Sequence, residues 1–466
     1  MSKSQAEIEK GPWITLDEVP LSKIHWKVFA CCSGCPLLDG YVIGIIAISL
    51  SIMNTQIPMS ANMLGLVGMG TLAGMFFGSL LGGYITDLIG RRKMYFLCFG
   101  YIVVLSVLQF FISNPMQAFI LRFLLGIGIG ANYPIAGPYM AEFSPKKYRG
   151  SIVGMLNAFW FCGYALSFVI GYLLLPLGNE TSWRWMLASS AVPAALWFLA
   201  GLTIPESPYW LVSKGRREEA NDILKLIGNN VILPEAQETE EKTAFLEIFR
   251  HGYGKWVFFA SAFWTLQIVP TMGIGTYTPM IMGQLGFTEG DMQYLGAAIM
   301  NVFYLLGLIP VFFLVESWGR RPTIIWPFLV SSIALFVLGA TSNMNMSFAF
   351  ILFVFIIYGA FTVAMGAHCW IYPNELFPTH VRGTAMGFIT ALTRLAAAVG
   401  TFLTPVILGN FGVTITLYIC GVMFFLGFLL CLIMAPETKN MNLADTASLN
   451  KSKASEEKIV VDTICD

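Results

Sequence analysis

Charged residues are scarce in this chain. Only 12% of its 466 residues are Asp, Glu, Lys or Arg, whereas a soluble domain has about 25%. Hydrophobic residues make up 56% of the chain. Basic and acidic residues balance at 27 each, so the net charge gives no reason to expect a nucleic acid partner. The composition therefore indicates that most of the chain lies in a lipid bilayer.

The chain also lacks features that would place it in other classes. Its first 26 residues carry no pattern of basic segment, apolar core and small-residue cleavage site, so no cleaved signal peptide is expected. Its nine cysteines have no regular extracellular spacing, so no disulfides are expected. Cys31-Cys32-x-x-Cys35 could suggest a metal or redox site, but no histidine or second cysteine pair completes a tetrahedral set. Because no nucleophile–base pair, metal cluster or phosphate loop is found, neither an enzyme nor a cofactor is expected.

Long apolar runs dominate what is present. A helix that spans a bilayer needs about 20 mostly apolar residues. Twelve such runs are found, at 27–50, 62–86, 93–112, 116–141, 150–176, 185–204, 256–283, 292–315, 323–340, 346–371, 383–408 and 412–435. Six precede the polar segment 205–255 and six follow it. The chain is therefore predicted to be an all-α membrane protein with twelve transmembrane helices.

Four landmarks of the first six runs recur in the last six. Each pair lies between 229 and 233 residues apart and keeps the same order, which indicates a duplicated half. The pairs are Gly90 with Gly319, Glu142 with Glu375, Arg149-Gly150 with Arg382-Gly383, and Pro205-Glu206-Ser207 with Pro436-Glu437-Thr438. The predicted organisation is an N-terminal segment 1–26, a bundle 27–204, a central loop 205–255, a second bundle 256–435 and a tail 436–466.

Basic residues are concentrated in alternate links between the runs. They occur after the second, fourth, sixth, eighth and tenth runs, and Arg184 is the exception. Because basic residues favour the cytoplasmic side, both termini and the central loop are expected to be cytoplasmic. The compact links favour a bacterial inner (plasma) membrane. The central loop is expected to hold short amphipathic helices, for example Arg216–Ile227.

Four ionisable residues lie inside the runs: Asp39, Arg122, His368 and Arg394. Such groups cost about 3 kcal/mol on insertion scales, and their default interpretation is functional. Desolvation favours the neutral form of Asp39, and a nearby arginine favours its charged form. If Asp39 gains and loses Arg122 between conformations, it will bind and release a proton. A static Asp39–Arg122 pair is the alternative.

Arg394 lies near the middle of its run and cannot lose its charge. A fixed guanidinium facing a cavity would bind a carboxylate through two hydrogen bonds. The alternative is that Arg394 pairs with a backbone carbonyl or with Asp39. His368 could relay protons or be a hydrogen-bonded neutral residue. Further polar and aromatic candidates for a cavity lining are Asn132, Asn157, Trp160, Trp264, Gln267, Tyr277, Asn301, Tyr304 and Trp370.

Charged residues at the cytoplasmic ends of the runs form a separate set. Clustered between two halves, they could act as a cytoplasmic gate that closes the inner side; the alternative is that they only orient the helices. The set is Asp87, Arg91, Arg92, Glu142, Arg149, Glu316, Arg320, Arg321, Glu375 and Arg382. In the second run, Gly70, Gly74, Gly78 and Gly82 form a small-residue stripe that predicts close approach of another helix.

Several motifs resemble signatures of the major facilitator superfamily, and the match covers nearly the whole chain. They are Gly83-x-x-x-Asp87-x-x-Gly90-Arg91-Arg92, Arg122-x-x-x-Gly126-x-Gly128-x-Gly130, Glu142…Arg149-Gly150, Pro205-Glu206-Ser207-Pro208-x-Trp210-Leu211, Pro373-Asn374-Glu375-Leu376-Phe377-Pro378…Arg382-Gly383 and Pro436-Glu437-Thr438-Lys439. Those from Glu142 onward are similar to the sugar-porter-like branches. The resemblance implies two pseudo-symmetric six-helix bundles, a central site and alternating access.

Other positions depart from the sugar porters. Three residues fit the helix-7 pattern of that branch: Gln267, Tyr277 and Pro279. The helix-1 aspartate of that branch falls on Val42. Asp39-Gly40-Tyr41 instead resembles the start of a motif of aromatic-acid/proton symporters, and Arg394 is similar to an arginine of organic-anion transporters.

We therefore expect a proton-coupled symporter of a small organic anion. Asp39 and Arg122 are the predicted proton-coupling pair. The predicted substrate-binding residues are Arg394, Asn157, Trp160, Asn132, Gln267, Tyr277, Asn301 and His368. A proton-coupled sugar or polyol porter is the alternative, and a non-transporting receptor on the same fold is the third reading. The expected partners are a small-molecule substrate, protons and the lipid bilayer, and the chain is expected to act as a monomer.

Overall fold

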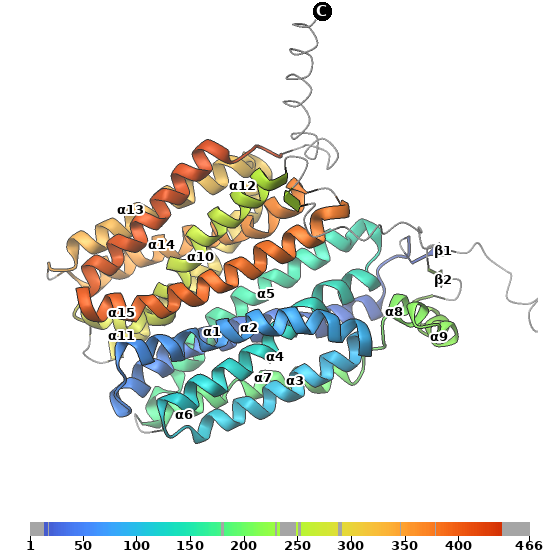
Figure 1. Ribbon diagram of the computed structural model, residues 1–466, viewed down its shortest axis with the longest axis horizontal. Helices are drawn as coiled ribbons and strands as arrows, with labels where there is room; N and C mark the ends of the chain where they lie inside the picture. The colour runs from blue at the N-terminus through green and yellow to red at the C-terminus, as the bar shows by residue number, and fades with distance from the viewer. Residues whose placement is uncertain are drawn as a thin grey trace, which may run out of the picture.

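The computed structural model describes residues 14–16, 18–178, 181–228, 231–233, 248–249, 253–287, 291–344, 346–377 and 379–439. Helices α1 to α7 form one half of the molecule, drawn in blue to green in Figure 1. Their bounds are α1 Lys23–Gln56, α2 Ala61–Ile89, α3 Arg91–Leu108, α4 Pro115–Phe143, α5 Lys146–Leu173, α6 Ser182–Ala188 and α7 Ala191–Gly201, with short 3-10 turns η1 Gln109–Phe111 and η2 Leu175–Leu177.

Helices α10 to α15 form the other half, drawn in yellow to red (Figure 1). Their bounds are α10 Tyr253–Gln284, α11 Met292–Leu306, α12 Leu308–Trp318, α13 Arg320–Thr341, α14 Phe348–Leu376 and α15 Thr379–Met434. The halves contact each other through α1 and α10, α2 and α15, and α5 and α11. The chain therefore has the expected all-α architecture of two helix bundles.

Twelve transmembrane helices follow from these bounds. Ten helical segments of the described residues are long and apolar enough to cross a membrane. The last of them, Thr384–Met434, holds two spans because the helix bends at Gly412, whose φ is 79°. The sixth predicted run is divided between α6 and α7, which follow each other closely and complete the twelve.

The glycine stripe of α2 packs against α4, as the sequence predicts. A Cβ atom at Gly74 would collide with the carbonyl oxygen of Phe123, and one at Gly78 would collide with that of Ile127. A Cβ atom at Gly82 would lie 2.6 Å from Cα of Ala131. The absence of side chains thus lets the two backbones approach at van der Waals distance, which is the main source of helix association in lipid.

The polar segment after α7 forms two short helices at one end of the bundles (Figure 1). They are α8 Pro208–Ser213 and α9 Arg217–Ile227. Helix α9 buries Ala220, Leu224 and Ile227 and exposes charged residues, so the predicted amphipathic helix is confirmed. Strand β1 Ile14–Thr15 pairs in parallel with β2 Val231–Ile232, so the segment before α1 contacts the central loop.

We expect Gly74→Ala to lower the melting temperature of the purified protein, because its methyl group would push α2 away from α4 at the Phe123 carbonyl. Gly387→Ala is the matched control, since nothing lies within 4 Å of a Cβ atom built there. Alanine is the better helix former by about 1 kcal/mol, so Gly387→Ala should leave the melting temperature unchanged or raise it. Equal melting temperatures for the two variants would contradict the packing argument.

Candidate functional site

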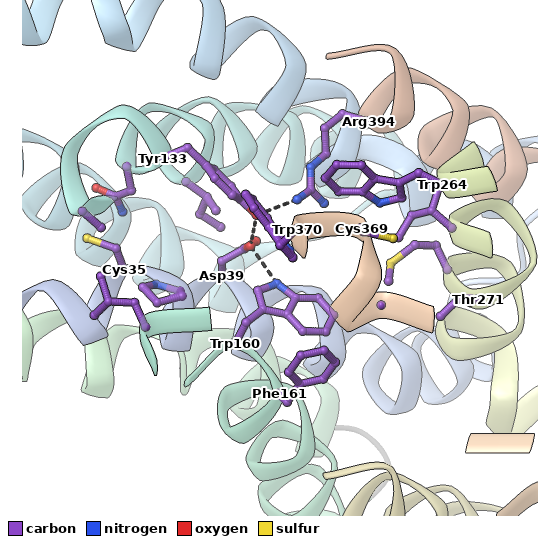
Figure 2. Close-up of a pocket in the computed structure, with 18 of the residues that line it drawn as sticks. Cys35, Asp39, Tyr133, Trp160, Phe161, Trp264, Thr271, Cys369, Trp370 and Arg394 are labelled. Carbon is purple, nitrogen blue, oxygen red and sulfur yellow. Dashed lines mark hydrogen bonds between the residues drawn. The ribbon is translucent and has the colours of Figure 1, made fainter. Parts of the chain in front are cut away.

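A cavity of about 220 Å³ lies between the two halves. Its walls come from α1, α4 and α5 on one side and from α10, α11, α14 and α15 on the other. Apolar and aromatic side chains make up most of the lining, and a few polar groups interrupt it (Figure 2). Pockets of this composition are typical of small-molecule sites.

Asp39 of α1 is the acid of this cavity and is only 2% exposed. Its Oδ2 accepts a hydrogen bond from the Tyr133 hydroxyl of α4 and a second one, of 2.7 Å, from Nε1 of Trp160 on α5. Figure 2 shows both bonds. Its other oxygen, Oδ1, is buried and has no partner among the described residues. Asp39 therefore keeps one oxygen available within the cavity.

Arg394 of α15 is the cation of the same cavity and is 9% exposed. Its Nη2 donates a 2.8 Å hydrogen bond to the hydroxyl of Tyr133, and its guanidinium carbon lies 5.1 Å from the centre of the Tyr133 ring. Tyr133 therefore accepts from Arg394 and donates to Asp39. This chain of three side chains crosses from one half to the other and places the Asp39 carboxyl and the Arg394 guanidinium on the same hydroxyl.

Aromatic rings surround this chain of hydrogen bonds. Trp160 stacks on Tyr164 with an interplanar angle of 10°, and Trp264 meets Trp370 edge-on at 5.6 Å. Gln267 bonds to Thr271 through its Nε2, at 3.2 Å. The walls thus offer flat apolar surfaces close to a carboxyl group, a guanidinium and an amide.

Asn132 is a further polar group of the lining. It is 2% exposed, yet neither its Nδ2 nor its Oδ1 has a hydrogen-bond partner in the described part of the chain. An unpaired buried amide is costly. Its donor and its acceptor are consequently available to a molecule in the cavity.

Five of the predicted site residues line the cavity together: Asp39, Asn132, Trp160, Gln267 and Arg394. The other cavity candidates Trp264, Tyr304 and Trp370 do so as well. The side chain of Asn157 lies outside the described residues.

Three predicted substrate residues lie elsewhere, each held by another bond. Asn301 donates to the carbonyl of Ala297 in its own helix, at 2.8 Å. His368 lies on the α13 side of α14, where Nε2 is 2.9 Å from the Thr323 hydroxyl. Tyr277 donates to the carbonyl oxygen of Leu64 at 3.1 Å and so joins the halves beyond the cavity.

Arg122 is also not where the sequence placed it. Its Nη2 donates to the carbonyl oxygen of Val42, at 3.1 Å, rather than to Asp39. The cation that acts on Asp39 is Arg394. A static Asp39–Arg122 pair is thus absent from this conformation, because Asp39 lies about one helical turn before the residue that faces Arg122. A pair that forms in another conformation stays a prediction.

Tyr133 is the site residue that sequence reasoning did not assign. Composition alone does not separate it from other tyrosines in apolar runs. The signal that could have found it is its position next to Asn132 and before the helix-breaking Pro134, in the same run as Arg122.

The predicted cytoplasmic gate residues form equivalent clusters in the two halves. Arg91 pairs with Asp87 at 2.9 Å and with Glu142 at 3.2 Å, and Arg320 pairs with Glu375 at 3.2 Å. Each of these ion pairs joins residues of one half, and the side chains of Arg149, Glu316 and Arg382 lie outside the described residues. A gate that joins the halves therefore stays a prediction.

Backbone conformation explains why a glycine precedes each pair of arginines. Gly90 and Gly319 have φ of 103° and 98°, and a Cβ atom there would collide with the carboxylate of Glu206 or lie 2.5 Å from that of Glu437. Each carboxylate accepts from backbone N–H groups in the first turn of the next helix. Glu206 accepts from Arg92 in the first half, and Glu437 accepts from Arg320 and Arg321 in the second. Burial alone would raise the pKa of Glu437, but these N–H groups and that of Lys439 hold it below its ordinary value.

Comparison with known proteins agrees with this architecture. The Escherichia coli (strain K12) protein YaaU is 37% identical over 94% of this chain and 98% of its own length. The inner membrane metabolite transport protein YgcS of the same strain is 32% identical over 96% and 99%. Its D-xylose-proton symporter is 27% identical over 89% and 93%.

Among solved structures, the inward open conformation of the xylose transporter XylE from E. coli is similar to this chain. The TM-score is 0.78 at 25% identity, and the match covers 91% of this chain and 99% of that one. A family model described as "Sugar (and other) transporter" matches residues 26–449. The chain therefore belongs to the sugar (and other) transporter family and is an integral, multi-pass membrane transporter of the major facilitator superfamily, not an enzyme.

Proposed function

We propose that this transporter carries a small organic anion together with a proton, by alternating access at the cavity between its halves. The observation that supports this most is the chain of hydrogen bonds from Asp39 through Tyr133 to Arg394. Asp39 can take up a proton and Arg394 can bind a carboxylate, and both are hydrogen-bonded to the Tyr133 hydroxyl. The name of the D-xylose-proton symporter relative supports proton coupling in this family.

Charge balance in a low-dielectric cavity links the two events. Without substrate, the Asp39 carboxylate offsets the Arg394 guanidinium. A substrate carboxylate that binds Arg394 takes over this role, and the Asp39 charge is then left without its cation. Protonation of Asp39 restores neutrality, so one proton enters with each monovalent anion. Only a neutral cavity of this kind can change its access from one side of the membrane to the other at low cost.

The remaining parts of the machinery follow from the same proposal. Both termini and the loop between the bundles 27–204 and 256–435 face the cytoplasm, on the side of the arginine-rich links. The charge clusters around Arg91 and Arg320 act as the gate on that side. A single chain supplies every wall of the cavity, so the transporting unit is a monomer.

A neutral sugar or polyol is the second candidate substrate. Gln267 and the tryptophans of the cavity favour it, since amides and flat rings suit hydroxyl-bearing rings with apolar faces. The xylose relatives point the same way. In that case Arg394 would keep its bond to Tyr133 while substrate is bound.

Arg394→Met should weaken carboxylate binding by roughly 10- to 100-fold, because losing a charge-assisted hydrogen bond costs about 1.5–3 kcal/mol. The measurement is a thermal-shift panel of carboxylates, aromatic acids, sugars and drugs on the purified protein, followed by titration of the best ligand. Arg184→Met is the matched control, since Arg184 bonds the carbonyls of Phe110 and Ile112 away from the cavity. Stabilisation by neutral sugars with no response to acids would refute the anion proposal and support the second candidate.

Asp39→Asn should uncouple transport from the proton gradient, because an amide cannot take up a proton at this position. In proteoliposomes, a gradient of one pH unit should drive about tenfold accumulation by the wild type at one proton per anion. The variant should show no accumulation but should still exchange labelled for unlabelled substrate. Gradient-driven accumulation by Asp39→Asn would remove Asp39 from the coupling mechanism.

Asn132→Leu should weaken substrate affinity by about 5- to 10-fold, the value of one buried hydrogen bond. It should leave the melting temperature unchanged or raise it, because the amide has no protein partner to lose. Asn301→Leu is the control. It should lower the melting temperature and leave substrate affinity unchanged, because the Asn301 amide donates to the Ala297 carbonyl outside the cavity. An Asn132→Leu protein that is less stable but binds substrate normally would assign Asn132 to packing.

A further inference from the structure

Arg122 is a buried charge that the substrate site does not use. It lies on α4, is 1% exposed, and forms no ion pair among the described residues. Its single hydrogen bond in the described residues joins Nη2 to the carbonyl oxygen of Val42. The N–H groups at Nε and Nη1 have no protein partner there. A guanidinium cannot lose its charge to reduce this cost.

The described groups around Arg122 do not supply a negative charge. Within the described residues no carboxylate forms an ion pair with it, and Asp39 is engaged with Tyr133 and Trp160. The titratable neighbour that acts on Arg122 is Tyr277, whose hydroxyl donates to the Leu64 carbonyl. A carbonyl dipole and a phenol are weak compensation for a full charge at this depth.

Helices from both halves meet at this position. Gly70 of α2 faces Arg122 closely, since a Cβ atom there would lie 3.4 Å from Cβ of Arg122. Two residues earlier on α2, a Cβ atom at Gly68 would touch the Tyr277 hydroxyl and lie 3.5 Å from Cγ2 of Thr401. The buried hydroxyls of Thr71 on α2 and Thr401 on α15 have no partner in the described part of the chain. Arg122 thus lies where α4 packs against α2, close to the contact of α2 with α10 and α15.

We propose that Arg122 binds a small monovalent inorganic anion, of the class of chloride, as its counter-ion. The site lies among α1, α2, α4 and α10, beyond the substrate cavity and beside the Tyr277–Leu64 contact that joins the halves. The anion accepts from the unpaired guanidinium N–H groups and offsets the charge that no carboxylate of this region balances. It is distinct from the substrate, which binds at Arg394.

The test replaces chloride by gluconate at constant ionic strength in the purified, full-length protein. We expect the melting temperature of the wild type to rise saturably with chloride, by roughly 3 °C or more. Arg122→Met should abolish this shift. Arg394→Met, which removes the other buried guanidinium, should retain it. A wild-type melting temperature that does not respond to chloride, or a shift that persists in Arg122→Met, would overturn the proposal.

A second measurement does not depend on whether Arg122→Met folds. Crystals of the wild type grown in bromide should give an anomalous peak at hydrogen-bond distance from Nε or Nη1 of Arg122. Ordered water at that place gives density without anomalous signal. A map with no anomalous peak beside Arg122 would refute the anion site even if chloride changed the stability.

Discussion

A carboxylate and a guanidinium that share one tyrosine hydroxyl link the two halves of this transporter at its centre. Asp39 and Tyr133 come from the first half, and Arg394 comes from the second. Charges at this depth must be balanced, so neither half can move away from the other without a replacement for the lost partner. In the proposed mechanism, substrate binding, proton uptake and the relative movement of the bundles depend on the same few atoms.

The two halves begin one of their helices, α3 in the first half and α13 in the second, in the same way. In each half, a glycine with positive φ precedes a helix that begins with two arginines. A glutamate distant in the sequence accepts from backbone N–H groups in the first turn of that helix. Glu206 and Glu437 serve this purpose for α3 and α13. Because a helix N-terminus favours negative charge, the arrangement also fixes where the basic side chains project. The repeated motifs therefore encode the backbone geometry at the start of these two helices.

The fold could be predicted from sequence because it depends on the length of apolar runs, the spacing of glycines and a repeated set of landmarks. The bend at Gly412 and the division between α6 and α7 left the number of spans unchanged. The composition of the site was predicted in part. Asp39 and Arg394 were identified because intramembrane charges are rare, but the partner of each depends on helix rotation.

Sequence reasoning therefore failed where rotation about a helix axis decides which side chains meet. Arg122 faces Val42 rather than Asp39, and His368 faces α13 rather than the cavity. A difference of one helical turn or of one helix face produces each result. Tyr133 was not assigned for the same reason, since only its neighbours in space distinguish it from other tyrosines.

Two cysteines on facing walls of the cavity have a practical consequence. Cys35 belongs to α1 and Cys369 to α14, and both thiols line the hollow between the bundles. The two thiols are 4% and 1% exposed in this conformation. Their reaction with an alkylating reagent added on one side of a sealed vesicle therefore depends on whether the cavity opens to that side.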